Sequence, residues 1–260
     1  MSPNSPPPAP ACRPSTEPWH VLQRVLKWST LALVGYATLL ALLTLATPQR
    51  ALIYLHWARW PLGKDFRRPE GFGLAPGSAR YVQLKTADAV HLGAWHVLPE
   101  SVYQQHHKQL LDDPTAADVS AAAIYEDALR THGVVIYLHG NAASRGHHPR
   151  VEVYKKLAKY SDVNVLTIDY RGFADSEGTP SEAGLVEDAH TAWRWLQHRG
   201  VAAEKITVLG HSLGTGVAVQ LTAKLSTAGS PPRALILKAP FTSVPEVAFE
   251  FPVFKYLPLL

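Results

Sequence analysis

A serine between two glycines, at the junction of an apolar run and a helical pattern, constrains this sequence most. Residues 205–222 read Lys-Ile-Thr-Val-Leu-Gly-His-Ser-Leu-Gly-Thr-Gly-Val-Ala-Val-Gln-Leu-Thr, and Gly210 to Gly214 match the G-x-S-x-G pattern of a nucleophile elbow. The strand and helix of an elbow approach so closely that a side chain at either glycine would clash. The motif predicts Ser212 as a nucleophile, with the backbone N–H of Leu213 facing the place where an oxyanion would form.

The surroundings of the motif separate it from a chance match. The pentapeptide alone is a weak signal, because Gly and Ser are common residues, and an ordinary strand-turn-helix is the alternative. Residues 206–209 are an apolar run typical of a buried parallel strand. Val217, Leu221 and Leu225 recur every four residues, as one face of a helix does. This context favours the elbow.

Similar runs alternate along the rest of the chain. The predicted strands are residues 80–86, 90–98, 134–138, 163–168 and 234–237, and the predicted helices are residues 121–129, 151–160 and 185–196. The first two strands flank Ala87-Asp88 and predict a hairpin. The remaining alternation of strand and helix predicts an α/β fold with a parallel sheet and right-handed crossovers.

A second loop carries candidate site residues directly after the predicted strand 134–138. It reads His139-Gly140-Asn141-Ala142, and a loop in this position supplies the second oxyanion donor of an α/β-hydrolase. That donor would be the N–H of Asn141, and Gly140 would let the backbone bend towards a substrate. His139 could serve as a base, or it could fix the loop, which is the interpretation that we prefer.

The N-terminal part predicts a tail and a membrane anchor. Residues 1–24 begin with a run rich in Pro, Ser and Ala, which predicts disorder. No charge interrupts residues 29–49, so residues 25–48 are predicted to form one transmembrane helix. A signal peptide and a buried core helix are the alternatives. The apolar stretch and the preceding tail are too long for the first, and the segment is unusually uniform for the second.

Residues 49–79 are predicted to be a juxtamembrane connector. They mix Tyr54, Trp57, Trp60 and Phe66 with cations, which suits the lipid headgroup boundary, although the aromatic side chains could equally pack on the domain. More cations follow the apolar segment than precede it, which favours a cytosolic catalytic domain by the positive-inside tendency.

Composition excludes several classes of function. The formal net charge of +4 comes without a basic stripe or a nucleic-acid-binding motif, so no nucleic-acid partner is expected. Cys12 is the single cysteine, which excludes an intrachain disulfide framework. His106 and His107 lie in a polar stretch, 99–132, that we interpret as a surface insertion. The paired histidines could suggest a metal site, but they lack a partner at helical ligand spacing, and a solvated loop is the interpretation that we prefer. No metal or cofactor is expected.

With these pieces in place, the chain from about residue 52 resembles the membrane-anchored α/β-hydrolase lipases that act on monoacylglycerols and lysophosphatidylserine. The matching stretches are Leu-Gly-Ala-Trp-His (92–96), Tyr-Glu-Asp-Ala-Leu (125–129), His-Gly-Asn-Ala (139–142), Asp-Tyr-Arg-Gly (169–172), Gly-Thr-Pro-Ser-Glu (178–182) and Gly-His-Ser-Leu-Gly-Thr-Gly-Val-Ala (210–218). The resemblance implies Ser212 as nucleophile, Asn141 and Leu213 as backbone oxyanion donors, a lipid ester substrate and a single-pass anchor in the endoplasmic reticulum membrane. The family's catalytic domain often faces the lumen, against the charge count, so the side of the membrane stays open.

The chain departs from the family pattern after Ser212. The acid and the histidine of this fold follow the serine in chain order, but residues 213–260 contain no Asp and no His, only Glu246 and Glu250 as carboxylates. Residues 80–260 are therefore predicted to be a partial α/β-hydrolase domain, C-terminally incomplete. Ala174 also replaces a usual glycine, which we expect the loop to tolerate.

Two functions remain open at this stage. One is a membrane-anchored serine hydrolase that cleaves acyl esters through an acyl-enzyme. The alternative is a truncated, non-catalytic membrane protein that binds lipid or a partner. Peptidase, thioesterase and small-ester activities also use G-x-S-x-G.

Overall fold

The computed structural model describes residues 17–112, 119–243 and 246, and the chain divides into two units, residues 1–49 and 50–260. The first unit contains α1 (Glu17–Leu43), which from Trp19 to Leu43 is long and apolar enough to cross a membrane by length and composition. At 1.5 Å per residue these 25 residues span about 37 Å. The apolar run predicts a span to residue 48, but the helix ends at Leu43, where the backbone N–H groups of Thr44 and Leu45 donate three residues back, to Ala41 O at 3.2 Å and Leu42 O at 3.0 Å. The next helix, α2 (Ala46–Tyr54), starts after this turn.

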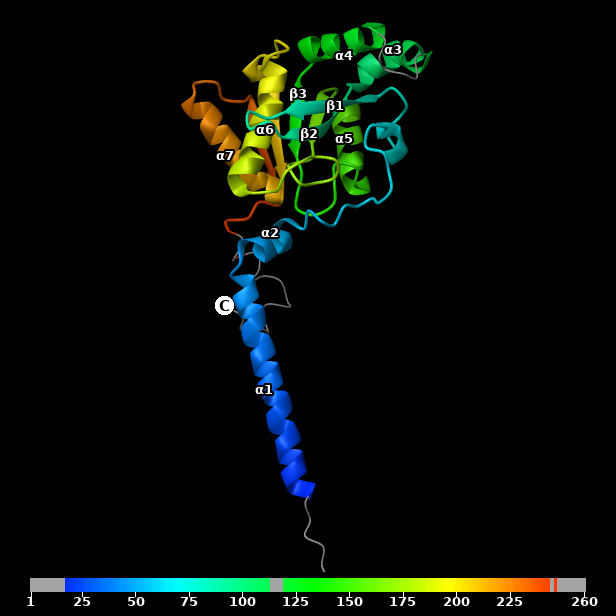
Figure 1. Cartoon of the computed structure of the whole chain (residues 1–260). Helices are drawn as coiled ribbons and strands as arrows, with labels where there is room; N and C mark the ends of the chain where they lie inside the picture. The colour runs from blue at the N-terminus through cyan, green and yellow to red at the C-terminus, as the bar shows by residue number, and fades with distance from the viewer. Residues whose placement is uncertain (1–16, 113–118, 244–245, 247–260) are drawn as a thin grey trace, which may run out of the picture. The chain divides into compact units, whose positions relative to one another are not determined.

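The second unit consists of a sheet with helices on both sides (Figure 1). Its strands are β1 (Ala79–Lys85), β2 (His91–Val97), β3 (Val134–Leu138), β4 (Asn164–Ile168), β5 (Ile206–His211) and β6 (Ala234–Lys238). Its helices are α3 (Glu100–Asp112), α4 (Val119–Thr131), α5 (His148–Tyr160), α6 (Glu182–Gln197) and α7 (Leu213–Thr227), with short 3-10 turns at Pro69–Phe72 and Ala203–Lys205.

The strand order is β1-β2-β4-β3-β5-β6. β3 pairs in parallel with β4 and β5, and β5 pairs in parallel with β6, as the alternation of strands and helices predicts. The predicted hairpin is also confirmed, since β1 and β2 are antiparallel with Leu84 opposite Leu92. β2 runs antiparallel to β4, so the sheet is mixed and not purely parallel. The six strands and their helices form an α/β fold, as the sequence predicts.

Each face of the sheet has its own apolar core. Successive strand side chains point to opposite faces, so in β3 Ile136 faces α6 and α7, whereas Tyr137 faces α5. All five residues of β3 are buried, which explains why the strand is apolar without alternation. The ordered core fixes the ends of β3 and β5, where the two predicted site loops begin.

The insertion after β2 is helical, which corrects the expectation of a solvated loop around His106 and His107. Both residues lie on α3, which forms a third apolar cluster with α4. Leu110 of α3 and Ile124, Tyr125 and Ala128 of α4 are buried in it. The polar residues that suggested a loop occupy the remaining surface of an amphipathic helix pair.

Candidate active site

Ser212 lies in a strained turn between β5 and α7. Its backbone angles are φ 51° and ψ −119°, a conformation that non-glycine residues rarely adopt. The N–H of Ser212 donates to Lys238 O of β6 at 2.9 Å, and its carbonyl accepts from the N–H of Thr215 at 2.8 Å. The turn is therefore held on both sides, as an elbow requires.

The glycines of the motif are needed for close packing. A Cβ atom at Gly210 would overlap the backbone of Gly214, and a Cβ atom at Gly214 would overlap the carbonyl of Leu138 in β3. The loop after β3 also contacts the elbow, because a Cβ atom at Gly140 would lie only 3.1 Å from Ser212 Cβ. The structure thus brings the two predicted loops together.

Arg150 of α5 binds the carbonyl oxygens of the loop after β3. Its buried guanidinium donates from Nη2 to Gly140 O at 3.1 Å, to Asn141 O at 3.0 Å and to Ala142 O at 2.9 Å. It also donates from Nη1 to Ser144 O at 2.9 Å. A trans peptide directs its N–H opposite to its C=O, so this contact turns the N–H groups of the next residues away from Arg150.

The connector accepts two of these N–H groups. Ala142 N–H donates to Tyr54 O and Ala143 N–H donates to Ala58 O, each at 3.0 Å. Both alanines have positive φ, 55° and 52°, a conformation that costs energy and persists where its surroundings fix it. The N–H of Asn141 has no acceptor within the described residues. It is left available for a ligand, at the position that the sequence predicts for an oxyanion donor.

Neither histidine next to these loops is placed as a base for Ser212. His139 is fully buried, with Nδ1 2.7 Å from Gly140 O and Nε2 3.1 Å from Asp169 Oδ1. Burial lowers the pKa of His139, and the charge of Arg150 lowers it further. His211 Nδ1 lies 3.4 Å from the hydroxyl of Tyr137, not against Ser212. These contacts favour the interpretation of His139 as a loop-fixing residue.

A cluster of charged side chains around buried Arg145 stabilises the loop after β3. Arg145 contacts Asp169 Oδ2 at 2.5 Å and Asp175 Oδ1 at 2.6 Å through Nη1, and its backbone N–H donates to Asp169 Oδ1 at 2.7 Å. Burial alone would raise the pKa of Asp169, but the charge of Arg145 holds it below its usual value. Asp169 is therefore occupied by Arg145 and does not serve as an acid beside Ser212.

A cavity of about 450 Å³ adjoins the elbow at Leu213. Its walls come from α2, α6, α7 and the segment after β6, and its lining is Ile53, Tyr54, Glu182, Leu185, Leu213, Gly216, Val217, Gln220, Phe241, Thr242 and Ser243. This size lies within the range of small-molecule sites. Apolar side chains predominate around it, so it suits an apolar group attached to a reacting ester.

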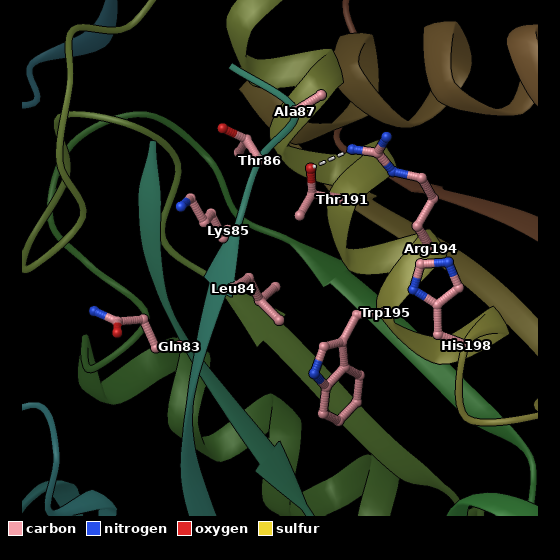
Figure 2. Close-up of a pocket in the computed structure, with 9 residues that line it drawn as sticks. All are labelled: Gln83, Leu84, Lys85, Thr86, Ala87, Thr191, Arg194, Trp195 and His198. Atoms are coloured by element: carbon pink, nitrogen blue, oxygen red, sulfur yellow. Dashed lines mark hydrogen bonds between the residues drawn. The ribbon is translucent and has the colours of Figure 1, made fainter. Parts of the chain in front are cut away.

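A second cavity, of about 290 Å³, lies between β1 and α6 (Figure 2). Lys85, Arg194 and His198 line it, and Arg194 donates to Thr191 Oγ1 at 3.1 Å and to Glu187 Oε1 at 2.6 Å. Its lining includes neither Ser212 nor the loop after β3. Within the described residues, no group of three or more His, Cys, Asp or Glu side chains is placed to hold a metal.

Sequence patterns miss two contributors to this arrangement. Arg150 binds carbonyl oxygens of a separate loop, and the connector contributes its own carbonyl oxygens at Tyr54 and Ala58. Backbone acceptors leave no mark on residue type, so only the folded backbone reveals them. Asn141, Gly210, Ser212, Leu213 and Gly214, by contrast, occupy the places that the motifs predict.

Comparison with known proteins identifies relatives of the chain. The model of the family described as serine aminopeptidase, S33 matches residues 130–257. The lysophosphatidylserine lipase ABHD12 of Danio rerio is 36% identical over 253 residues, covering 95% of this chain and 61% of the relative. The enzyme of the same name from Mus musculus is 37% identical, covering 92% and 57%. The chain therefore spans about three fifths of the length of these relatives.

A solved structure supports the fold independently. The α/β-hydrolase from Vibrio vulnificus superposes with a TM-score of 0.52 at 21% sequence identity, covering 72% of this chain and 55% of that protein. At this identity the likeness concerns the fold alone. The chain therefore has an α/β-hydrolase fold, and over most of its length it is similar in sequence to proteins named lysophosphatidylserine lipases.

Proposed function

We propose that the chain is the membrane-anchored part of a serine hydrolase of the acylglycerol and lysophospholipid lipase type. The observation that carries this proposal is the strained turn at Ser212, packed against a loop whose Asn141 N–H has no acceptor among the residues that the structure describes. The lipid substrate is supported by the names of the relatives, which are lysophosphatidylserine lipases, and by the mostly apolar cavity at Leu213.

The geometry of the two loops supports the following reaction. The hydroxyl oxygen of Ser212 attacks the carbonyl carbon of an ester, and the N–H groups of Asn141 and Leu213 stabilise the oxyanion. The alcohol then leaves, an acyl-enzyme remains, and water releases the fatty acid. The acyl chain would lie in the cavity that begins at Leu213.

The hydroxyl proton of Ser212 needs a base that the described residues do not place beside it. Loss of triad members lowers turnover by about 10⁴ to 10⁶. We therefore expect the 260-residue chain itself to be inert. This same observation favours the second candidate, a non-catalytic membrane protein that binds lipid or a partner through the same cavity.

Fluorophosphonate labelling of Ser212 distinguishes the two candidates. The protein to test is the chain continued past Leu260 with the C-terminal part of the Danio rerio relative, called here the extended form. It should react with the probe and hydrolyse a monoacylglycerol or a lysophospholipid, and Ser212→Ala should abolish both. An extended form that folds but does not react favours the non-catalytic alternative. Labelling of Ser212 in the 260-residue chain would reveal a base within it.

Membrane attachment belongs to the same proposal. We propose that α1 is a single-pass anchor and, by resemblance, that the membrane is that of the endoplasmic reticulum. A bilayer-dissolved lipid then reaches a site tethered nearby. Release of the intact protein by alkaline extraction would contradict the anchor, and protease protection of the catalytic unit in sealed microsomes would assign its side.

A further inference from the structure

The end of α2 and the connector that follows it expose large apolar side chains. We define the connector surface as Leu52, Trp57, Trp60 and Leu62, whose exposed fractions are 58%, 64%, 59% and 71%. Other aromatic residues of this segment face inward: Tyr54 is half-buried on the core beneath α6 and α7, and half-buried Phe66 packs with buried Phe72 on the opposite core. The structure thus divides the aromatic side chains into an inward and an outward set.

We propose that the connector surface docks in the headgroup region of a lipid bilayer. Tryptophan is enriched at that boundary, because its ring is apolar and its N–H is polar. In the sequence Arg59 lies between Trp57 and Trp60, and Arg67 follows Leu62; both are exposed and pair with no carboxylate in the described part of the chain. Such cations are attracted to lipid phosphates and to the anionic lipids of a cytosolic leaflet.

Chain length favours a bilayer over a protein partner. Leu52 follows Leu43, the last residue of α1, by nine positions. Nine residues reach about 30 Å when fully extended, and less where they form a helix. The connector surface therefore cannot move far from a bilayer that α1 crosses. The inference rests on the membrane anchoring proposed above and adds which surface of the catalytic unit meets the lipid.

Docking would link lipid access to the catalytic loop. The inner side of the same segment supplies Ile53 and Tyr54 to the lining of the cavity at Leu213. Tyr54 O and Ala58 O also accept the N–H groups of Ala142 and Ala143. A connector seated in the headgroup region would hold the cavity and Ser212 at the depth where the ester bonds of membrane lipids lie.

Depth-dependent quenching tests the proposal without any requirement for activity. The full chain, with Cys12→Ser, carries one new cysteine at a time, labelled with an environment-sensitive fluorophore, in vesicles of phosphatidylcholine and phosphatidylserine. Acyl-chain-brominated lipids should quench labels at Trp57→Cys and Leu62→Cys. Tyr160→Cys at the end of α5 is the matched control, since Tyr160 is an aromatic residue that is 76% exposed and lies outside the connector, and it should not be quenched. Leu33→Cys in α1 reports on the anchor and should be quenched strongly.

Each other outcome overturns the inference in a distinguishable way. Quenching at Leu33 without quenching at Trp57 and Leu62 leaves the anchor intact and refutes docking. No quenching at Leu33 refutes the anchor, and docking with it. Equal quenching at Tyr160 means that no particular surface meets the bilayer. If the emission of the label at Trp57→Cys shifts to the blue but brominated lipid does not quench it, then protein, such as a second copy of the chain, covers the surface. The double variant Trp57→Ser and Trp60→Ser should reduce quenching at Leu62, whereas Leu111→Ser should not.

Discussion

Arg150 Nη2 donates to the carbonyl oxygen of Gly140 at 3.1 Å, and this contact fixes the direction of the N–H group of Asn141 across the same peptide bond. The planar guanidinium reaches three further carbonyls of the loop, a fork geometry that lysine cannot reproduce. Arg150 is therefore a positioning residue, since it acts on an ester only through the backbone that it holds.

Arg150→Ala should slow the chemical step in the extended form. Loss of one oxyanion donor costs about 10² to 10³ in kcat, so we expect a fall of about 10²-fold with KM little changed. Arg150→Lys should restore part of this loss. Lys155→Ala on the same helix is the control, because its ion pair with Glu152 is exposed and contributes little. An unchanged kcat in Arg150→Ala would contradict this role. So would a fall in kcat that is the same for all three substitutions and is accompanied by an equal loss of thermal stability.

The two glycines at the start of α7 should respond oppositely to alanine. A Cβ atom at Gly214 meets the backbone of β3, whereas one at Gly216 meets nothing within 4 Å. Gly214→Ala should lower the free energy of unfolding by about 1 to 3 kcal/mol, because backbone must shift. Gly216→Ala should raise it by up to about 1 kcal/mol through helix propensity. Thermal unfolding in detergent measures both, and equal effects would mean that Gly214 is not at a tight contact.

Short-range patterns predict most of the sheet and both site loops. Val134 to Leu138 and the run before Gly210 are apolar because both sheet faces are covered, and Gly214 is glycine because β3 lies against it. Burial on both faces and close contact with backbone each restrict the residue type at a single position, so the sequence can predict them. The antiparallel pairing of β2 with β4 leaves no comparable trace, because antiparallel and parallel partners can bury the same side chains.

Contacts made by backbone atoms could not be predicted from the sequence. Tyr54 and Ala58 hold the loop after β3 with carbonyl oxygens, which any residue could supply. Arg150 is an ordinary helical cation by pattern, and α3 was missed because its polar face outweighs its apolar one. At Ala174 the residue type does not match the backbone conformation. Its φ of 45° is one that glycine adopts more easily than alanine, which explains why a glycine suits that turn better.

Buried His96 should make the fold sensitive to acid. Asn164 Nδ2 donates to Ala128 O at 2.8 Å. The Oδ1 of Asn164 therefore faces His96 Nε2, 2.8 Å away, and accepts a hydrogen bond from its N–H. Nδ1 then carries no proton and has no partner in the described residues. Burial, followed by the charge of Arg80, lowers the pKa of His96 to about 3.

The sign follows from proton binding. Between pH about 6.5 and about 3 the unfolded chain binds a proton on His96 that the folded protein does not. Stability is therefore complete above pH 6.5 and falls as the pH drops, by about 1.4 kcal/mol per pH unit for one such group. His96→Gln should lower stability at pH 7 but flatten the slope between pH 6.5 and 5. An unchanged slope would assign the acid sensitivity to other groups, such as buried His139.

The outer edge of β6 should promote self-association of the 260-residue chain. Among the described strands β6 pairs only with β5, and its central residues Leu235, Ile236 and Leu237 are partly exposed, Ile236 by 46%. An apolar strand with an unpaired edge is a template for pairing with another chain, and a charge placed on it opposes that pairing.

Ile236→Lys should therefore shift the detergent-solubilised chain from aggregates towards a monodisperse species in light scattering. Val219→Lys is the matched control, since Val219 is 45% exposed on α7, away from the edge, and the added charge is the same. Equal improvement by both substitutions would assign the effect to net charge, and a monodisperse parent chain would refute the exposed edge as the cause of association.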